Sequence, residues 1–203
     1  MKKIEYEYKE KYGNISKDEI ERMDQLLSTV KSTKKLKDEL FPHMRRNLNM
    51  EWKSVDFTVY LVPKATPRPR HNISRNIFYV KGAKDNKDIF KKFIKNYDGE
   101  IITTPCKFRC ISYLPIPSSM NAVEKILAEL GLIRPISKPD FDNLAKTYSD
   151  MLQGTLLYDD ALIVEGISKK FYSTKPRIEI HIEYMLEQDS LYNKKKMLKK
   201  EGL

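Results

Sequence analysis

The sequence contains few of the residues that bind transition metals or form disulfides. Its only cysteines are Cys106 and Cys110, and its only histidines are His43, His71 and His181. The histidines are scattered, and two cysteines four residues apart in a strand-like stretch lie too far apart to bond, so neither a zinc site nor a disulfide is expected. Free, reduced thiols are typical of a cytosolic protein. Any catalytic metal therefore needs oxygen ligands.

Long apolar runs are also absent. No stretch approaches the ~20 apolar residues that span a bilayer, and the N-terminal MKKIEYEYKE lacks the apolar core of a secretory signal. We therefore expect a cytoplasmic protein with no membrane partner. Acidic residues are fewer than basic ones: the chain has 28 aspartates and glutamates and 38 lysines and arginines, which gives a formal net charge of +10. This excess favours a polyanionic partner, most commonly nucleic acid.

The 203 residues suffice for one domain with appended segments. Residues 1–52 are expected to form a helical extension, in which Ser16 and Glu19 form a capping box and a second helix ends before Pro42. The main domain is expected over residues 53–186, followed by a basic tail over 187–203.

Hydrophobic periodicity predicts the elements of the main domain. Strands are expected at 55–62, 77–80, 106–114, 161–172 and 177–185, and helices at 89–97, 121–130 and 142–153. The short connection STKP predicts that the last two strands form an antiparallel hairpin. In the helix capped by Asn121, we expect a buried stripe made of Ala122, Val123, Ile126, Leu127 and Leu130.

The stretch KPDFDNLAKTYSD, residues 138–150, concentrates acidic residues in a basic chain. In a helix that starts near Asp142, residues four apart are surface neighbours, so Asp142, Lys146 and Asp150 form one stripe. The opposite arc is expected to face the core, and it contains Phe141, Leu144, Ala145, Tyr148, Met151 and Leu152. For the stripe taken alone, an ordinary amphipathic helix with ion pairs on its solvated face is the favoured explanation.

A second acidic cluster makes a metal site possible. Asp159 and Asp160 follow soon after the expected helix end at Gly154, and the loop GTLLY is long enough to return them to the helix. Asp140, Asp142 and one of these paired aspartates would then converge. Because three carboxylates repel one another, a cation is expected among them, and oxygen ligands favour Mg²⁺ or Mn²⁺.

A carboxylate-bound metal in a protein suited to polyanions suggests phosphodiester cleavage. Lys146 is expected to stabilise the negative charge that develops on the scissile phosphate. A calcium loop is excluded, because Leu144 and Ala145 occupy positions where such a loop needs a ligand and a glycine. An aspartate-nucleophile phosphotransferase is disfavoured by the two prolines in RPISKP, which precedes Asp140 instead of an apolar strand.

Several blocks of sequence occur together in one order. They are PRPR, LPIPSS, KPDFDNLAK, DMLQG followed by YDD, and KPRIEIHI. Together these blocks, over about residues 55–185, resemble the RusA family of Holliday-junction resolvases, endonucleases carried by many phages and prophages. The resemblance implies an α+β fold, a mixed β-sheet with packed helices, and a homodimer whose two-fold symmetry suits paired cuts in a four-way DNA junction.

The resemblance also assigns site residues. Asp140, Asp142 and Asp160 match the family's metal-binding catalytic aspartates, and Lys146 matches its essential lysine. The acidic positions near the site are matched by Asp150 and Asp159, and Leu162 departs from the family pattern, which usually has a polar residue there. Apart from the resemblance, Arg68, Arg70 and Lys138 are candidates for phosphate contacts, and ordinary surface arginines explain Arg68 and Arg70 equally well.

The expected activity is Mg²⁺-dependent cleavage of Holliday junctions during DNA recombination and repair, with Mn²⁺ able to substitute. Two alternatives stay open. One is a nuclease that acts on other branched DNA, such as flaps or forks. The other is a non-catalytic DNA-binding protein, whose affinity would depend on salt and not on divalent metal.

Overall fold

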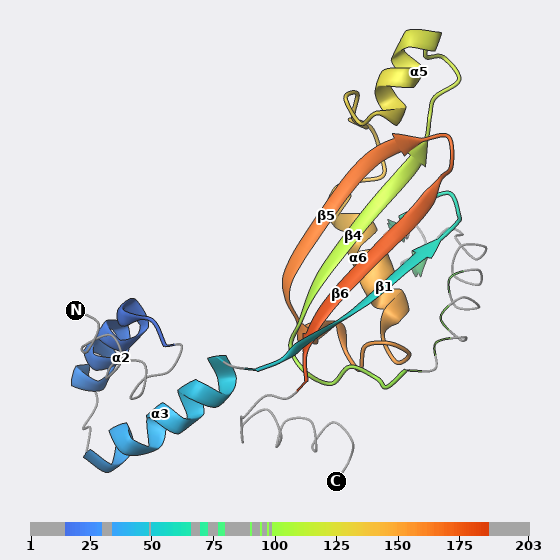
Figure 1. Ribbon diagram of the computed structural model, residues 1–203. Helices are drawn as coiled ribbons and strands as arrows, with labels where there is room; N and C mark the ends of the chain where they lie inside the picture. Colours follow the sequence, from blue (N-terminus) through green and yellow to red (C-terminus); the bar gives the residue numbers. More distant parts are fainter. Residues whose placement is uncertain are drawn as a thin grey trace. The chain divides into compact units, whose positions relative to one another are not determined.

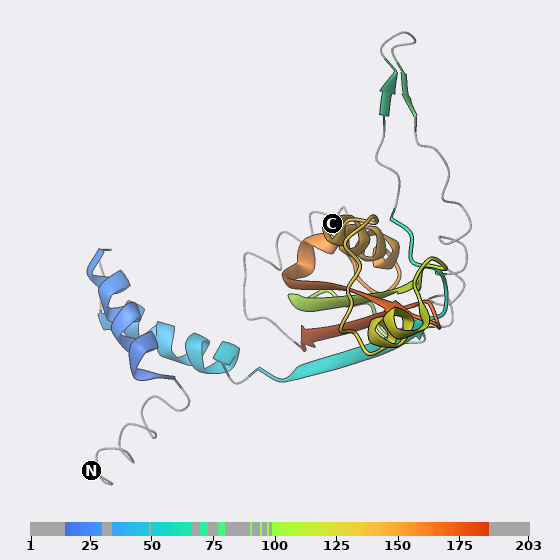
Figure 2. The same ribbon diagram turned by 90° about the horizontal axis from the view of Figure 1, so that it is seen from above.

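The computed structural model describes residues 15–29, 34–48, 50–65, 70–72, 77–79, 90, 94, 97 and 99–186. The chain forms two compact units, one from Met1–Trp52 with Met185–Leu203 and the other from Lys53–Tyr184. Figures 1 and 2 show the elements from two directions. In the described part of the chain, no helix is long and apolar enough to cross a membrane.

The N-terminal unit contains α2 (Lys17–Thr29) and α3 (Lys34–Leu48). The expected capping box is confirmed, because Glu19 N–H donates to Ser16 Oγ over 3.2 Å and Ser16 N–H donates to Glu19 Oε2 over 2.9 Å. The expected helix end before Pro42 is wrong, since α3 continues to Leu48 with Pro42 inside it. The missing N–H of Pro42 removes only one intrahelical hydrogen bond, which a solvated helix can tolerate at a cost in stability.

The Lys53–Tyr184 unit is built around a mixed four-stranded sheet with helices packed on it, so the expected α+β fold is confirmed. Strand β4 is parallel to β5 and antiparallel to β6. The strand order is β1 (Trp52–Val59), β6 (Arg177–Met185), β4 (Cys106–Pro115) and β5 (Ile163–Ser173).

The expected hairpin between β5 and β6 is wrong, because β4 lies between them (Figure 1). The physical reason lies in the composition of β4, which buries Cys106, Phe108, Cys110, Ser112 and Leu114 on one face. A strand this deeply buried gains most from a hydrogen-bonded neighbour on each side. The short connection after Ser173 therefore crosses over one strand before β6 begins.

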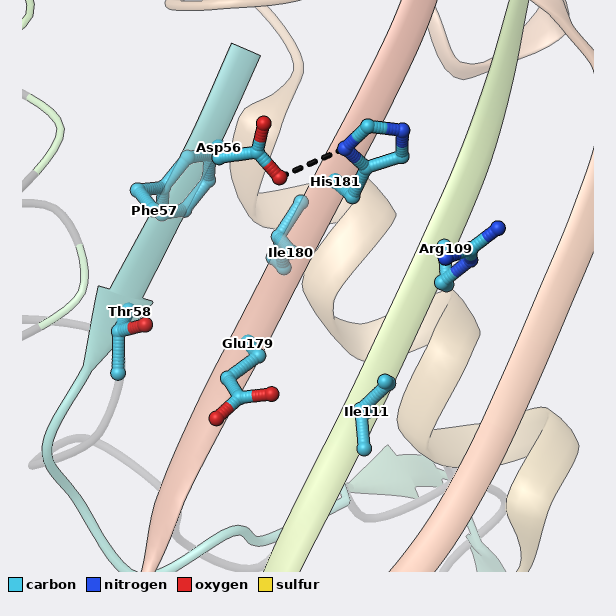
Figure 3. A pocket seen from close by; sticks show the side chains of 8 residues that line it. All are labelled: Asp56, Phe57, Thr58, Arg109, Ile111, Glu179, Ile180 and His181. Carbon is cyan, nitrogen blue, oxygen red and sulfur yellow. Dashed lines mark hydrogen bonds and ion pairs between the residues drawn. The ribbon is translucent and has the colours of Figure 1, made fainter. Parts of the chain in front are cut away.

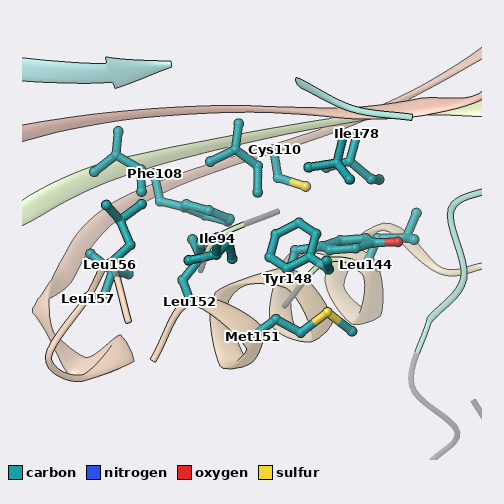
Figure 4. Packing of buried hydrophobic residues seen from close by; sticks show 14 of the residues in the cluster. Ile94, Phe108, Cys110, Leu144, Tyr148, Met151, Leu152, Leu156, Leu157 and Ile178 are labelled. Carbon is teal, nitrogen blue, oxygen red and sulfur yellow. The ribbon is translucent and has the colours of Figure 1, made fainter. Parts of the chain in front are cut away.

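The core lies between one face of the sheet and helix α6 (Phe141–Leu152), as Figure 4 shows. Leu144, Tyr148 and Leu152 are fully buried on the helix, and Ile178 and Ile182 are fully buried on β6. Phe141, which was expected in the core, is instead 61% exposed, because it is the first residue of the helix and precedes the packed turns.

Helix α5 (Ala122–Glu129) begins at Asn121 with a complete capping box, as expected, and Gly131 at φ +74° follows its end. Its expected buried stripe is wrong. Ala128 is the buried residue of the helix, whereas Val123, Ile126 and Leu130 are at least 61% exposed. The small satellite core around α5 accommodates only this alanine face, packed against Leu114 and Tyr172.

A second, two-stranded sheet pairs β2 (Arg70–Asn72) with β3 (Ile77–Tyr79) in antiparallel fashion. The expected strand at 77–80 is therefore confirmed over three of its residues. The expected helix at 89–97 lies mostly outside the described residues, although Phe90 and Ile94 are helical and buried.

Candidate active site

The polar side of α6 starts at Asp140, which occupies the N-cap position. Its backbone carbonyl accepts a hydrogen bond from Leu144 N–H over 3.1 Å, as an N-cap residue should. Its side chain, however, makes no capping hydrogen bond. Asp140 and Asp142 are both exposed, so their carboxylates face solvent from the first turn of the helix.

Lys146 lies one turn further along and links α6 to the start of β5. Its Nζ is 3.0 Å from Asp150 Oδ1 and 3.8 Å from Asp160 Oδ2. The hydrogen bond to Asp150 and the nearby negative charges of Asp150 and Asp160 raise the pKa of Lys146 above its usual value. The lysine is therefore a permanent cation at neutral pH, and it lies between Asp150 of α6 and Asp160, which precedes β5.

The chain returns to α6 through a tight turn after the helix. Gly154 has φ +75°, a conformation that favours glycine, and its N–H donates to Leu157 O over 2.7 Å. Leu157 is fully buried, and Tyr158 N–H donates to Ile102 O over 3.0 Å. These contacts fix the path that places Asp160 beside Lys146.

The structure distinguishes the two paired aspartates by their contacts. Asp159 is the N-cap of the short 3₁₀ helix η1 (Asp160–Leu162), and its Oδ1 accepts a hydrogen bond from Ala161 N–H over 2.9 Å. Asp160 instead faces Lys146. Spacing alone could not separate these roles, because adjacent aspartates leave open which one caps the turn, whereas the family resemblance had singled out Asp160.

No contact with the Lys146 surface is described for the three basic residues expected to bind phosphate, Lys138, Arg68 and Arg70. Lys138 is exposed in the loop before α6. Arg68 lies outside the described residues, and Arg70 belongs to β2 but its side chain is not described. Among the described residues, no group of three or more histidine, cysteine, aspartate or glutamate side chains is arranged to hold a metal ion.

Two residues of β5 that sequence reasoning missed contact the loop before α6 and the first residue of that helix. Lys170 Nζ donates to Ser137 O over 2.9 Å and to Pro139 O over 3.0 Å. Ser168 Oγ donates to Phe141 O over 2.7 Å. The available signal was their spacing, because residues two apart in a strand share one face. No motif marks that face as one that contacts the loop.

The opposite face of the sheet carries a separate polar cluster, shown in Figure 3. His181 Nδ1 is 2.6 Å from Asp56 Oδ1, and its Nε2 is 3.2 Å from Glu183 Oε1. The hydrogen bond to Asp56, helped by Glu183, raises the pKa of His181 above its usual value. A shallow pocket here is lined by Asp56, Phe57, Thr58, Arg109, Ile111, Glu179, Ile180 and His181.

Comparison with known proteins identifies the chain's relatives. The family model described as Endodeoxyribonuclease RusA matches residues 61–183. An uncharacterized protein of Bacillus subtilis (strain 168), YqaN, is 35% identical over 135 residues, which cover 63% of this chain and 94% of that protein. The family match contains all of α6, η1 and β5, and hence every contact of Lys146 and Lys170 described above. The chain therefore belongs to the RusA family of endodeoxyribonucleases.

Proposed function

We propose that this protein is a metal-dependent endodeoxyribonuclease that resolves four-way DNA junctions. The observation that carries the proposal is the polar surface of α6, where Lys146 lies within 4 Å of both Asp150 and Asp160 inside the segment that matches the endonuclease family. A lysine surrounded by carboxylates on one surface suits chemistry on a phosphodiester.

The proposed metal ligands are Asp140, Asp142 and Asp160, whose carboxylates are not gathered into a metal site in the described structure and would have to draw together around the ion. Their chemistry fits a hard divalent cation, because Mg²⁺ binds carboxylate oxygens and water, and Mn²⁺ accepts the same ligands. Asp140 suits this role because its side chain does not cap the helix. When bound, the ion would polarise the phosphoryl oxygen and lower the pKa of a bound water.

The proposed role of Lys146 is electrostatic. Its ammonium group, held protonated by Asp150, stabilises the negative charge that develops on the scissile phosphate. Asp150 orients the lysine through the 3.0 Å contact one helical turn away. Asp159 acts at a distance from the phosphate, by capping the turn that presents Asp160.

The proposed substrate is branched DNA, bound by a homodimer in the cytoplasm. The formal charge of +10 supports binding to the phosphate backbone, with Lys138, Arg68 and Arg70 as proposed contacts. A two-fold dimer would place two copies of the α6 surface for paired cuts in opposing strands of a junction. Residues 1–52 precede the family match, which starts at residue 61, and we propose that they form an appended helical segment.

The test compares a mobile four-way junction with a linear duplex of the same sequence, in Mg²⁺ and in a chelator. We expect metal-dependent cutting of the junction only. Asp142→Asn and Lys146→Ala should bind the junction as well as the wild type does and fail to cut it. Lys125→Ala, an exposed lysine of α5, is the matched control and should cut normally.

The outcomes separate the alternatives. Equal cutting of junction and linear DNA would contradict junction selectivity, and preferential cutting of flaps or forks would reassign the substrate. Tight junction binding that falls steeply with salt, with no cutting in any divalent metal, would favour a non-catalytic DNA-binding protein.

A further inference from the structure

Side chains of strand β5 donate hydrogen bonds to the loop before α6, which contains Ser137 and Pro139. Lys170 reaches two backbone carbonyls of this loop, those of Ser137 and Pro139, and Ser168 reaches the carbonyl of Phe141. Both side chains project from the same face of β5, because they are two residues apart. The loop is therefore held by β5 at two points, and the first residue of α6 at a third.

These three contacts bracket Asp140. Pro139, which precedes it, and Phe141, which follows it, both have their carbonyl oxygens bonded to β5. The Asp140 side chain contributes nothing to this anchoring, since it makes no capping hydrogen bond. The backbone on either side of the carboxylate is thus fixed from outside, and the carboxylate itself is left to face solvent.

We propose that Lys170, assisted by Ser168, is a positioning residue of the nuclease, holding the Ser137–Asp142 segment so that Asp140 and Asp142 are set for catalysis. This inference rests on the proposed function of the two aspartates. An ammonium group has three donors and no acceptor, so Lys170 can bridge two carbonyls at once, and charged donors form the stronger hydrogen bonds. Displacement of reacting groups by about 1 Å can cost a hundredfold in rate.

The adjacent residue provides a matched control. Lys169 is exposed and, as the neighbour of Lys170 in a strand, projects from the opposite face of the sheet. Lys169→Met and Lys170→Met remove the same charge and the same side-chain type one residue apart. A difference between the two variants therefore reports the contact with the loop rather than the net charge of the protein.

The experiment measures three quantities for the full chain and for Lys170→Met, Lys170→Arg, Ser168→Ala and Lys169→Met. They are amide hydrogen exchange across residues 137–143, the dissociation constant for Mn²⁺, and kcat and KM on the four-way junction. For Lys170→Met we expect faster exchange confined to this segment, weaker Mn²⁺ binding, and kcat lowered about tenfold or more with KM nearly unchanged.

Lys170→Arg should recover part of each property, because a guanidinium also donates to carbonyls. Ser168→Ala should show a smaller effect than Lys170→Met, and Lys169→Met should match the wild type.

Wild-type exchange and Mn²⁺ affinity in Lys170→Met would overturn the proposal, even if cleavage were lost, because Lys170 would then act on the DNA. A rise in KM alone would overturn it for the same reason. If the wild-type protein cuts no DNA with metal, the proposed function fails, and exchange and Mn²⁺ binding still decide whether Lys170 holds the loop.

Discussion

Lys146 lies where it would compete with a divalent ion bound to Asp160. Its Nζ is 3.8 Å from Asp160 Oδ2, a proposed metal ligand, and 3.0 Å from Asp150 Oδ1. Lys146→Met removes the charge and keeps most of the length of the side chain. We expect two changes of opposite sign, in which junction cleavage falls about 10²- to 10³-fold and Mn²⁺ binds more tightly.

The size of the second change follows from the geometry. An ammonium group and a divalent ion about 4 Å apart in water repel strongly enough to change an equilibrium constant about thirtyfold before screening. The Lys146 side chain is 68% exposed, so water and salt screen it extensively. The dissociation constant for Mn²⁺ should therefore fall by about two- to fivefold in Lys146→Met, with the larger change at low salt.

Titration calorimetry with Mn²⁺ at two salt concentrations tests this expectation alongside the junction assay. Lys125→Met, which removes an exposed helical lysine elsewhere, should leave both the affinity and the cleavage rate unchanged. Asp160→Asn should weaken Mn²⁺ binding. If Mn²⁺ binds to Lys146→Met no more tightly than to the wild type, Lys146 and the metal do not share Asp160, and the proposed ligand set is wrong.

Three further outcomes follow from burial and hydrogen bonding. Leu144→Ala should lower the free energy of unfolding by about 2–5 kcal/mol in urea titrations, because this fully buried side chain anchors α6 to the sheet; a loss below about 1 kcal/mol would contradict this packing. Cys106 and Cys110 should resist thiol reagents until the protein unfolds, since burial raises the pKa of Cys106 to about 11 and that of Cys110 to about 12, and fast labelling of the native protein would refute it. Because the pKa of His181 is higher in the folded protein than its ordinary value of about 6.5, protonated His181 should stabilise the fold fully below a pH of about 6.5, and this stabilisation should be lost as the pH rises through the pKa of the folded state. Asp56→Asn should lower the pKa of His181 measured by NMR, and an unchanged pKa would show that Asp56 does not raise it.

Much of the local structure was predictable because it depends on residues close in sequence. The capping box of Asn121 and Glu124, the alternation of β4 and the inward face of α6 all follow from spacing alone. The approach of Asp160 to α6 was also predictable, since a short loop limits where the chain can go.

The features that sequence reasoning missed depend on residues far apart in the chain. The order of β5, β4 and β6 depends on which strand buries most side chains at the centre of the sheet. The length of the STKP connection gives no information about that order. The exposure of Val123 and Ile126 on α5 reflects how little of the core reaches that helix. The contacts of Lys170 with residues 31 and 33 positions away leave no trace in any local pattern.

The placement of β4 has a consequence for synthesis on the ribosome. Both hydrogen-bonded neighbours of β4 come later in the chain, and the last of them ends at Met185. A nascent chain that stops before Arg177 therefore leaves one edge of its most buried strand unpaired and exposes the apolar side of α6. Until that last strand emerges, the growing polypeptide is at its most prone to aggregate, and only afterwards can the sheet beneath α6 be completed.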